Sequence, residues 1–576
     1  MQQPVYFAPL GSDDAKQISR LQKKLFPREL TEPEDEIRQI LRNTEEFRVC
    51  NLSFGLFEGT KLVGYIFAYV ESESVFHQRD EEVIYIKEIA LSPGHERFLG
   101  PLFLKLFAQW LAFTPRMPVE AHAEEDSLAK WQRLTRVFRF YGLTLAVKDE
   151  ARREGRPPYK LLRLDVADSS TGLRQQASPL PPAGSTGSAD GATVTVLKDP
   201  RQWLSLKDRW DELLAETDDS NVFQSFEYLW QWWKYFGIWK DLRVLAIRRG
   251  EEVIGVVPFM MEYFPVFGRV ARKMMFLTAP MEMNRPKFLF GRNRATCLAA
   301  LLDYLDDTAD SWDILDIDEQ LDDEQVEAVR AHFRSSGQLL AESETLCPWI
   351  RLEGTWEAFI GGRSRRMRSN INRLRRKLAA EGEIAVRKVD TWPELDKAME
   401  TYCEIEERSW KAEKQLNISG NKAHYFFYRA LAKSFGGRDG SFQLRTLKCD
   451  GRPVAGTFGI ARDGVFQSLK IAHDSGYDRL SPGTVLESYE LEDLFGGSLQ
   501  RYEFMGSFLA NKLRWTSSVC KTTNIHVYRR RPQLMLFFFV FFVFKRHVKA
   551  ALKKTGQFDK VDRFLGRFKN NPFPRY

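Results

Sequence analysis

The most informative pattern of hydrophobic and polar positions lies between residues 465 and 515. Residues 465–471 alternate between the two classes and are β-prone, which predicts a strand. A polar turn over 473–480 precedes an amphipathic run over 484–495, and residues 502–506 resemble the next strand. Ser481 at the N-cap and Pro482 at the first helical position favour a helix that begins there. The order predicts a βαβ-like unit.

The start of this helix is a candidate phosphate site, formed by Ser481, Pro482, Gly483 and Thr484. Free backbone N–H groups and the positive end of the helix dipole attract anions at such a position. An ordinary capped crossover helix without a ligand explains the same pattern equally well.

Residues 1–166 predict one α/β unit. A hairpin is expected through Gly59, Thr60 and Lys61. The expected strands are 5–10, 53–58, 62–71, 82–91, 119–123, 143–149 and 160–166, and the expected helices are 13–26, 32–43, 98–113 and 127–141. Residues 167–192 follow as a segment rich in Ser, Gly, Pro and Ala without apolar periodicity, which indicates a flexible linker.

Two further regions share one order of elements. Region 193–350 predicts a strand, helices over 203–216 and around Trp232 and Trp233, a hairpin over 242–248 and 253–261, and then helix, strand and helix. Region 351–530 predicts helices over 356–381, 392–411 and 424–435, a hairpin over 442–449 and 453–460, and then the stretch described first. We interpret them as two divergent copies of one fold. The tryptophans suit a sugar-stacking platform, but helix packing in a core is the favoured interpretation.

Length and charge place limits on the class of protein. A chain of 576 residues, 43% of them hydrophobic, has room for roughly three or four domains. A formal charge of +7 does not by itself imply nucleic acid. The six cysteines show no metal-ligand spacing, so we expect a reduced compartment and no metal site. No signal peptide and no apolar run of about 18 residues is visible, which predicts a cytoplasmic location.

The order of elements in residues 1–166, with helices after the first, fourth and fifth strands, resembles the GNAT acyltransferase fold. In that family an Arg/Gln-x-x-Gly-x-Gly/Ala signature cradles the pyrophosphate of coenzyme A. The sequence here has Arg97-Phe98-Leu99-Gly100-Pro101-Leu102, so the resemblance implies that Arg97 and Gly100 bind the cofactor. Leu102 replaces a small residue, and Phe138 stands where the family often has Tyr. These departures favour a degenerate or regulatory copy over an active one.

Residues 193–530 carry a second, more specific set of motifs. They are Phe223-Gln224-Ser225 before 230–233, the basic run 366–378, Ser409-Trp410-Lys411, Gly451 to Gly456, Leu480-Ser481-Pro482-Gly483, and Glu503-Phe504-Met505-Gly506 followed by Lys512 and Trp515. Their order resembles the CelD/BcsL-like acetyltransferases, a GNAT-related family associated with bacterial exopolysaccharide and cellulose loci. Its tandem halves are similar to the FemAB aminoacyltransferases. Glu503 stands where Asp is usual.

Acyl transfer needs a held donor, a stabilised oxyanion and a base for the acceptor. The residues of the helix start would hold the donor, and a backbone N–H of the strand before His473 would stabilise the oxyanion. Candidates for the base are Glu503, His473 and the group Glu404, Glu406 and Glu407, and Lys512 is a further candidate catalytic residue. The alternatives are a salt bridge from Glu503 to Lys512 or Arg514, a solvated His473, and a solvated helix face for the three glutamates.

The predicted helix over 356–381 is strongly basic. Its cationic residues are Arg363, Arg365, Arg366, Arg368, Arg373, Arg375, Arg376 and Lys377. A solvated charged face usually mixes signs, so we favour binding of a phosphate-rich donor, a tRNA, or an anionic lipid or polysaccharide. Arg366, Arg373, Trp410 and Arg514 are the candidate substrate-binding residues.

The tail from 531 to 576 combines an apolar run with a basic one. Residues 534–544 are apolar on every face but too short to span a bilayer, and Lys545, Arg546, Lys549, Lys553 and Lys554 follow. This favours peripheral binding to anionic lipid, and packing into the last domain is the alternative.

Together these patterns predict an α/β protein of multiple GNAT-like domains: an N-terminal copy plus a FemAB-like tandem pair. The expected segments are 1–166, 167–192, 193–350, 351–530 and 531–576. The expected function is transfer of an acetyl or longer acyl group from acyl-CoA to an amine or hydroxyl of a cell-envelope sugar, lipid or amine. A FemAB-like transferase using aminoacyl-tRNA and a non-catalytic envelope-assembly protein are the alternatives. DNA is not an expected partner.

Overall fold

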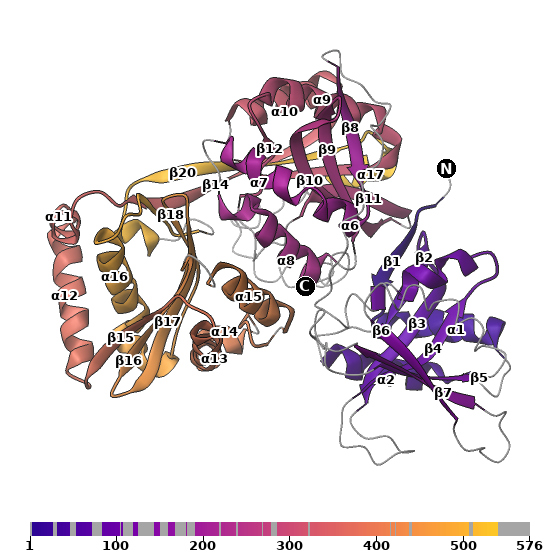
Figure 1. The fold of residues 1–576 in the computed structure, drawn as a ribbon, viewed down its shortest axis with the longest axis horizontal. Coiled ribbons are helices and arrows are strands. Elements are labelled where there is room, and N and C mark those ends of the chain that lie inside the picture. The colour runs from indigo at the N-terminus through magenta and orange to yellow at the C-terminus, as the bar shows by residue number, and fades with distance from the viewer. Residues whose placement is uncertain are drawn as a thin grey trace, which may run out of the picture.

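Two β-sheets organise the chain (Figure 1). The computed structural model describes residues 3–26, 31–46, 53–71, 83–103, 105–106, 119–124, 143–149, 159–166, 180, 191–217, 221–237, 240–267, 269–277, 285–320, 323–414, 416–420, 422–436, 440–505 and 511–539. The expected helix over 127–141 and the tail beyond 539 lie outside these residues, as do most of the expected linker and half of the expected helix over 98–113.

The N-terminal sheet has the strand order β1-β2-β3-β4-β5-β7-β6. Its strands are β1 (Val5–Pro9), β2 (Phe54–Glu58), β3 (Lys61–Glu71), β4 (Val83–Leu91), β5 (Val119–Glu124), β6 (Leu143–Asp149) and β7 (Tyr159–Val166). Helices α1 (Ala15–Leu25) and α2 (Glu34–Glu46) follow β1. β4 and β5 pair in parallel, while the other neighbours are antiparallel. This is the GNAT-like arrangement that the sequence predicts.

The larger sheet has 13 strands and contains two further copies of this arrangement. The first half has β8 (Ala192–Leu197), β9 (Asp241–Arg249), β10 (Glu252–Val266), β11 (Arg269–Phe276), β12 (Leu289–Phe290), β13 (Ile314–Gln320) and β14 (Leu339–Arg351). The second half has β15 (Ile384–Val389), β16 (Phe442–Cys449), β17 (Arg452–Arg462), β18 (Val465–His473), β19 (Arg501–Glu503) and β20 (Val519–Tyr528). Each half has a parallel pair in the place that β4 and β5 take, β11 with β13 and β18 with β19.

The two halves exchange their last strands. β14 follows the first half along the chain but pairs with β19 of the second, and β20 follows the second half but pairs with β13 of the first. β14 and β20 pair with each other in antiparallel fashion over ten residue pairs, from Leu339↔Tyr528 to Pro348↔Val519. The exchange makes one continuous sheet of the two halves, so neither half completes its sheet alone.

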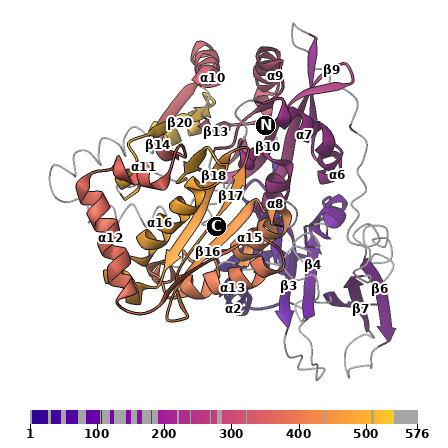
Figure 2. The ribbon, with the colours of Figure 1, turned by 60° about the vertical axis from the view of Figure 1, so that its left-hand side comes forward.

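Helices cover both faces of the second half (Figures 1 and 2). α12 (Arg365–Ala379) and α16 (Pro482–Phe495) lie on one face, and α13 (Glu394–Glu407), α14 (Trp410–Glu413) and α15 (Lys422–Phe435) lie on the other. The prediction of one helix over 356–381 is wrong, because α11 (Trp356–Gly361) ends at two glycines and Ser364 begins α12 by accepting from the Met367 N–H. The predicted helix over 392–411 is likewise divided into α13 and α14, since Ser409 caps the Lys411 N–H.

The first-half helices are α6 (Pro200–Leu204), α7 (Lys207–Ala215), α8 (Phe226–Phe236), α9 (Arg294–Asp307) and α10 (Asp323–Ser335). The aromatic run in α8 is core: Trp232 is fully buried. Tyr228 and Phe236 of α8 make edge contacts with Phe427 of α15, which joins the two halves on this face. The structure therefore confirms helix packing for the tryptophan cluster.

The described part of the tail forms α17 (Pro532–Phe538) against the first half. Leu534 and Phe537 are buried in one cluster with Ile314 and Tyr528. Leu536 is 52% exposed and Phe539 is 49% exposed. The run is thus partly core and partly surface. A helix of the length and apolar character that crossing a membrane requires does not occur in the part of the chain that the structure describes.

Candidate active site in the second half

Strands β18 and β19 part after a short parallel contact. They pair at Val465↔Arg501, Phe466↔Tyr502 and Gln467↔Glu503, and β19 ends there. β18 continues along β17 to His473, which pairs with Ala455, so His473 closes the strand rather than opening the loop that the sequence predicted. The carboxyl end of β18 therefore has a strand partner on one side only, at the position where open α/β sheets bind ligands.

A β-bulge in β18 lies where the strands part. Gly459 pairs with Ser468 and Phe458 pairs with Lys470, so Leu469 is an extra residue. β4 of the N-terminal sheet has the same feature, because Phe67 pairs with Glu88 and Ala68 with Ile86, which leaves Lys87 extra. β11 of the first half keeps a regular register with β10 throughout. A bulge leaves a backbone N–H group outside the hydrogen-bond ladder between strands, so β18 has one that can point towards a ligand. β11 has no bulge against β10 and therefore does not offer such a group.

The start of α16 lies directly beyond β18. Ser481 is the N-cap residue of α16, as predicted, and adopts a left-handed conformation with φ of 50°, but its side chain makes no capping hydrogen bond. Instead its carbonyl accepts from the N–H groups of Thr484 and Val485, at 3.0 and 3.1 Å. Pro482 has no backbone N–H. The Gly483 N–H is therefore the donor in the first turn of α16 that has no acceptor among the described residues.

His473 faces this helix start. A Cβ atom on Gly483 would lie 3.2 Å from His473 Nδ1, so the two residues are in near contact. His473 Nε2 lies 2.9 Å from the Asp478 carboxylate. If Nε2 carries the proton that Asp478 accepts, Nδ1 keeps its lone pair towards the helix start. The histidine is partly buried rather than freely solvated.

The turn between β18 and α16 is held by buried charge. Asp474 accepts from the Gly476 N–H at 2.9 Å and pairs with Arg408 and Arg452 at 2.9 and 2.8 Å. Burial opposes ionisation, but the Gly476 N–H and the two guanidinium groups outweigh it and hold the pKa of Asp474 below its usual range. The Arg408 carbonyl also accepts from the Ser475 N–H, which brings the end of α13 beside the turn.

Trp410 and Lys411 follow this end of α13. Trp410 is 45% exposed, and Lys411 donates to Glu406 at 2.9 Å. Glu406 is fully buried and also accepts from the Ile418 N–H, whereas Glu404 and Glu407 are exposed. The prediction of a solvated face is therefore wrong for Glu406, which holds the loop after α14. Burial lowers the pKa of Lys411, and Glu406 counteracts it.

Glu503 forms a buried charge pair between the two halves. It is 4% exposed and forms ion pairs with Arg285 of the first half and with Arg501, whose Nε lies 2.8 Å from a Glu503 carboxylate oxygen. The alternative foreseen from the sequence was a bridge to Lys512 or Arg514, but the partners are two other arginines. Gln467, its neighbour on β18, is 2% exposed, and its Oε1 finds no partner among the described residues. Each Glu503 oxygen faces a guanidinium group.

Lys512 begins the helical turn Lys512–Arg514 and donates to the carbonyls of the two residues after β19, Phe504, at 3.3 Å, and Met505. Burial lowers the pKa of Lys512, and Glu487 counteracts it. Glu487 of α16 accepts from Trp515 Nε1 at 2.5 Å. Removal from water raises the pKa of Glu487 to about 7, which the Trp515 hydrogen bond only partly offsets. Glu487 was not predicted as a site residue, although it is an acid directly after the apolar pair Val485 and Leu486.

The cationic face of α12 lies beside this site. Met367, Ile371, Leu374 and Leu378 are buried. Leu374 and Leu378 share a cluster with Val485 and Leu486, so the C-terminal end of α12 packs near the start of α16. The exposed residues of α12 include Arg365, Arg366, Arg368, Arg373, Arg376 and Lys377, and none of these six forms an ion pair with a described carboxylate. Arg514 is exposed as well.

Arg97 and Gly100 follow β4 of the N-terminal sheet and do not join this site. Arg97 is exposed with its guanidinium 4.9 Å from the centre of the Phe98 ring, and the space around Gly100 is open. Within β4, Glu88 accepts from Tyr65 and from Gln22, the latter at 3.2 Å. Burial raises the pKa of Glu88 despite these hydrogen bonds.

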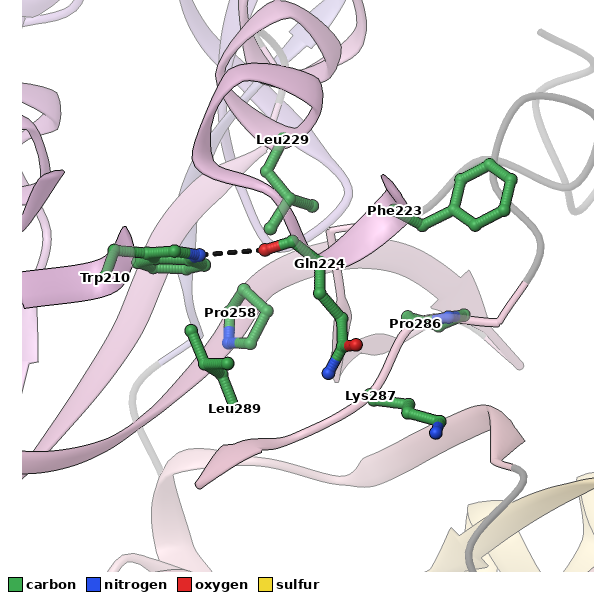
Figure 3. A pocket seen from close by; sticks show the side chains of 8 residues that line it. All are labelled: Trp210, Phe223, Gln224, Leu229, Pro258, Pro286, Lys287 and Leu289. Atoms are coloured by element: carbon green, nitrogen blue, oxygen red, sulfur yellow. Dashed lines mark hydrogen bonds between the residues drawn. The ribbon is translucent and has the colours of Figure 1, made fainter. Parts of the chain in front are cut away.

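The first half contains a cavity of about 240 Å³ at the start of α9. It is lined by Thr217, Gln224, Lys287, Phe288, Phe290, Arg294, Glu324 and Gln325. Figure 3 shows the packed wall beside it, where Trp210 Nε1 donates to the Gln224 carbonyl at 2.8 Å and the Gln224 and Lys287 side chains lie at the edge of the apolar packing. α9 follows β11 as α16 follows β18, but without the bulge.

Comparison with known families gives a match within the second half. Residues 365–511 match the family model described as "Acetyltransferase (GNAT) domain", in agreement with the GNAT resemblance predicted for this region. A search of curated proteins found no match.

Solved structures with similar chains include FemX (13% identity, 57% of this chain and 98% of that chain covered, TM-score 0.42). Another is a tandem GNAT protein from the clavulanic acid biosynthesis pathway (13%, 58% and 98%, TM-score 0.34). A third is L-PGS from Bacillus licheniformis (11%, 60% and 95%, TM-score 0.35).

Proposed function

We propose that the second half transfers an acyl group from an acyl-CoA to an amine or hydroxyl acceptor. The observation that carries this proposal is the parting of β18 from β19 beside the bulge at Leu469, with α16 beginning directly beyond. The donor thioester would lie along the free edge of β18. A backbone N–H redirected by the bulge would stabilise the oxyanion that forms when the carbonyl is attacked.

The donor's phosphates would lie at residues 481–484, where the Gly483 N–H and the helix dipole attract negative charge. The exposed arginines of α12, Arg366 and Arg373 among them, would add long-range attraction. In the N-terminal sheet, Arg97 and Gly100 stay a separate and weaker candidate for a phosphate.

For proton transfer we propose His473 as the first acceptor, because Asp478 holds one ring nitrogen and the other faces the helix start. Glu503 takes a proton from the acceptor only if one of its guanidinium partners is displaced, and it otherwise holds Arg285 across the two halves. Lys512 would position the end of β19 through the Phe504 and Met505 carbonyls. Trp410, exposed beside the turn, and Arg514 would contact the acceptor.

Calorimetric titration of the full chain with acetyl-CoA and with longer acyl-CoAs tests the proposal. We expect saturable binding to one or more of them, and transfer or slow hydrolysis of the acyl group that falls in His473→Ala. If no acyl-CoA binds, the proposal is wrong for the whole chain.

A second candidate is transfer of an aminoacyl group from aminoacyl-tRNA. The observation that favours it is the outer face of α12, which carries positive charge without a compensating described carboxylate. Such a face suits the phosphate backbone of RNA. Titration with tRNA at low salt, where phosphate contacts are strongest, should then show binding that Arg366→Gln/Arg373→Gln weakens, and absence of binding there rules this candidate out.

We also propose a setting at the cytoplasmic face of a membrane, in the synthesis of an envelope polysaccharide. The resemblance to exopolysaccharide-associated acetyltransferases supports the pathway class. Exposed Leu536 and Phe539, followed by Lys545 and Arg546 in the sequence, support peripheral contact with anionic lipid.

A further inference from the structure

Cys347 and Cys520 lie directly opposite each other on the exchanged strands. Cys347 is in β14 and Cys520 in β20, and the two are partners in the antiparallel register. The Cys520 thiol donates to the Cys347 carbonyl at 3.4 Å. Directly opposite residues of antiparallel strands have Cα atoms roughly 4.5–5.5 Å apart, which lies within the range of a disulfide.

The surroundings of the two thiols differ. Cys347 is 4% exposed, and Cys520 is partly open to solvent. The Cys520 thiol and then the Arg285 guanidinium act against burial and lower the pKa of Cys347 to about 6. The other described cysteines, Cys297, Cys403 and Cys449, are buried, and burial raises the pKa of each. A thiolate is the form that reacts with oxidants, so the five described cysteines are not equivalent.

We propose that Cys347 and Cys520 are an oxidation site, at which a peroxide converts the two thiols into a disulfide that joins the exchanged strands. The Cys347 thiolate attacks one oxygen of hydrogen peroxide, the O–O bond breaks, and hydroxide leaves to become water. Cys520 sulfur then attacks the resulting sulfenic acid and displaces hydroxide, which takes up the Cys520 proton as water. Two thiols lose two electrons, and one peroxide becomes two waters.

The disulfide changes the junction of the two halves in two ways. It ties β14 to β20, the strands through which each half completes the other's sheet. It also replaces a thiolate beside Arg285 with a neutral group, while Arg285 keeps its bridge to Glu503. The site is independent of the proposed acyl transfer, since it needs neither donor nor acceptor.

Peptide mapping of the full-length chain after treatment with hydrogen peroxide tests this. We expect a cross-linked peptide pair containing Cys347 and Cys520 that dithiothreitol releases, with Cys297, Cys403 and Cys449 left as free thiols. In Cys520→Ser the reaction should stop at a sulfenic acid on Cys347 that dimedone traps. Cys449→Ser, the matched control, should still form the cross-link.

The thermal midpoint gives a second readout on the wild-type chain. Oxidation should raise it by at least about 2 °C, because the bond closes a long loop, and reduction should reverse the rise. The proposal is overturned if Cys347 and Cys520 stay alkylatable after peroxide treatment, or if the disulfide that forms joins another cysteine such as Cys50.

Discussion

Arg285 and Glu503 form a buried ion pair between the two halves of the tandem unit. Arg285 is 3% exposed and precedes β12, and Glu503 is 4% exposed at the end of β19, beside the proposed site. A buried charge needs its partner, because water cannot replace it. The pair therefore couples the integrity of the site to the docking of the first half.

Arg285→Met should destabilise the chain by about 3 kcal/mol, because it leaves the Glu503 carboxylate with one guanidinium partner in a buried site. Arg285→Met/Glu503→Gln should recover part of that loss, since the uncompensated charge is gone. Chemical denaturation measures both. Equal stability of Arg285→Met and wild type would show that the pair does not hold the halves together.

Gly483→Glu should lower donor affinity by about tenfold or more. A side chain there crowds His473 Nδ1 at 3.2 Å, and its carboxylate repels phosphate at the helix start. Gly483→Gln is the matched control, because its side chain crowds His473 equally but carries no charge. Its donor affinity should lie between those of wild type and Gly483→Glu. Wild-type affinity for acyl-CoA in a folded Gly483→Glu protein would place the donor elsewhere.

Glu487 should make stability depend on pH. Its pKa is raised from 4.5 to about 7 in the fold, so between these values the folded chain holds a proton that the unfolded chain has lost. The stabilisation is present below pH 4.5 and is lost as the pH rises through 7. The effect should be on the order of 1 kcal/mol after allowance for partial exposure.

Denaturation of wild type and Glu487→Gln at pH 5 and pH 8 measures this contribution. We expect the difference in stability between the two pH values to shrink in Glu487→Gln. Exposed Glu404→Gln is the control and should leave it unchanged. An identical pH dependence in all three proteins contradicts the assignment.

Membrane contact should depend on the exposed residues of the tail and not on the buried ones. Leu536→Glu/Phe539→Glu should release the protein from anionic vesicles while leaving its thermal midpoint near that of wild type, because both side chains are about half exposed. Val386→Glu, an equally simple exposed change on β15, is the control. Rising salt should weaken wild-type binding without abolishing it, as measured by vesicle sedimentation, because salt screens only the electrostatic contribution. If the wild-type protein does not bind anionic vesicles, the proposal of membrane contact through the tail is wrong.

The sequence pattern was enough for most elements around the site. Alternation and the Pro482 signal predicted β18 and α16, since both depend on local preferences. The N-cap position of Ser481 was predicted correctly, but the pattern could not show that its carbonyl, and not its hydroxyl, accepts from the helix N–H groups.

Long-range features could not be predicted from the pattern. The local sequence of β14 and β20 does not indicate which half each strand joins, so the exchange cannot be predicted from it. The sequence offered Lys512 or Arg514 as the alternative ion-pair partners of Glu503, but Arg285 reaches it from the first half. Glu406 is different, because it continues the buried stripe of Leu395, Met399 and Tyr402 at helical spacing and was open to prediction.

The most direct test of the central claim is hydrogen–deuterium exchange of the full chain with and without saturating acetyl-CoA. The account predicts slower exchange in peptides covering Leu469 to His473 and Ser481 to Val485, because the donor would lie against the bulge and the helix start. Binding without protection there, or with protection confined to residues 83–106 of the N-terminal sheet, would contradict it and place the donor site in another domain.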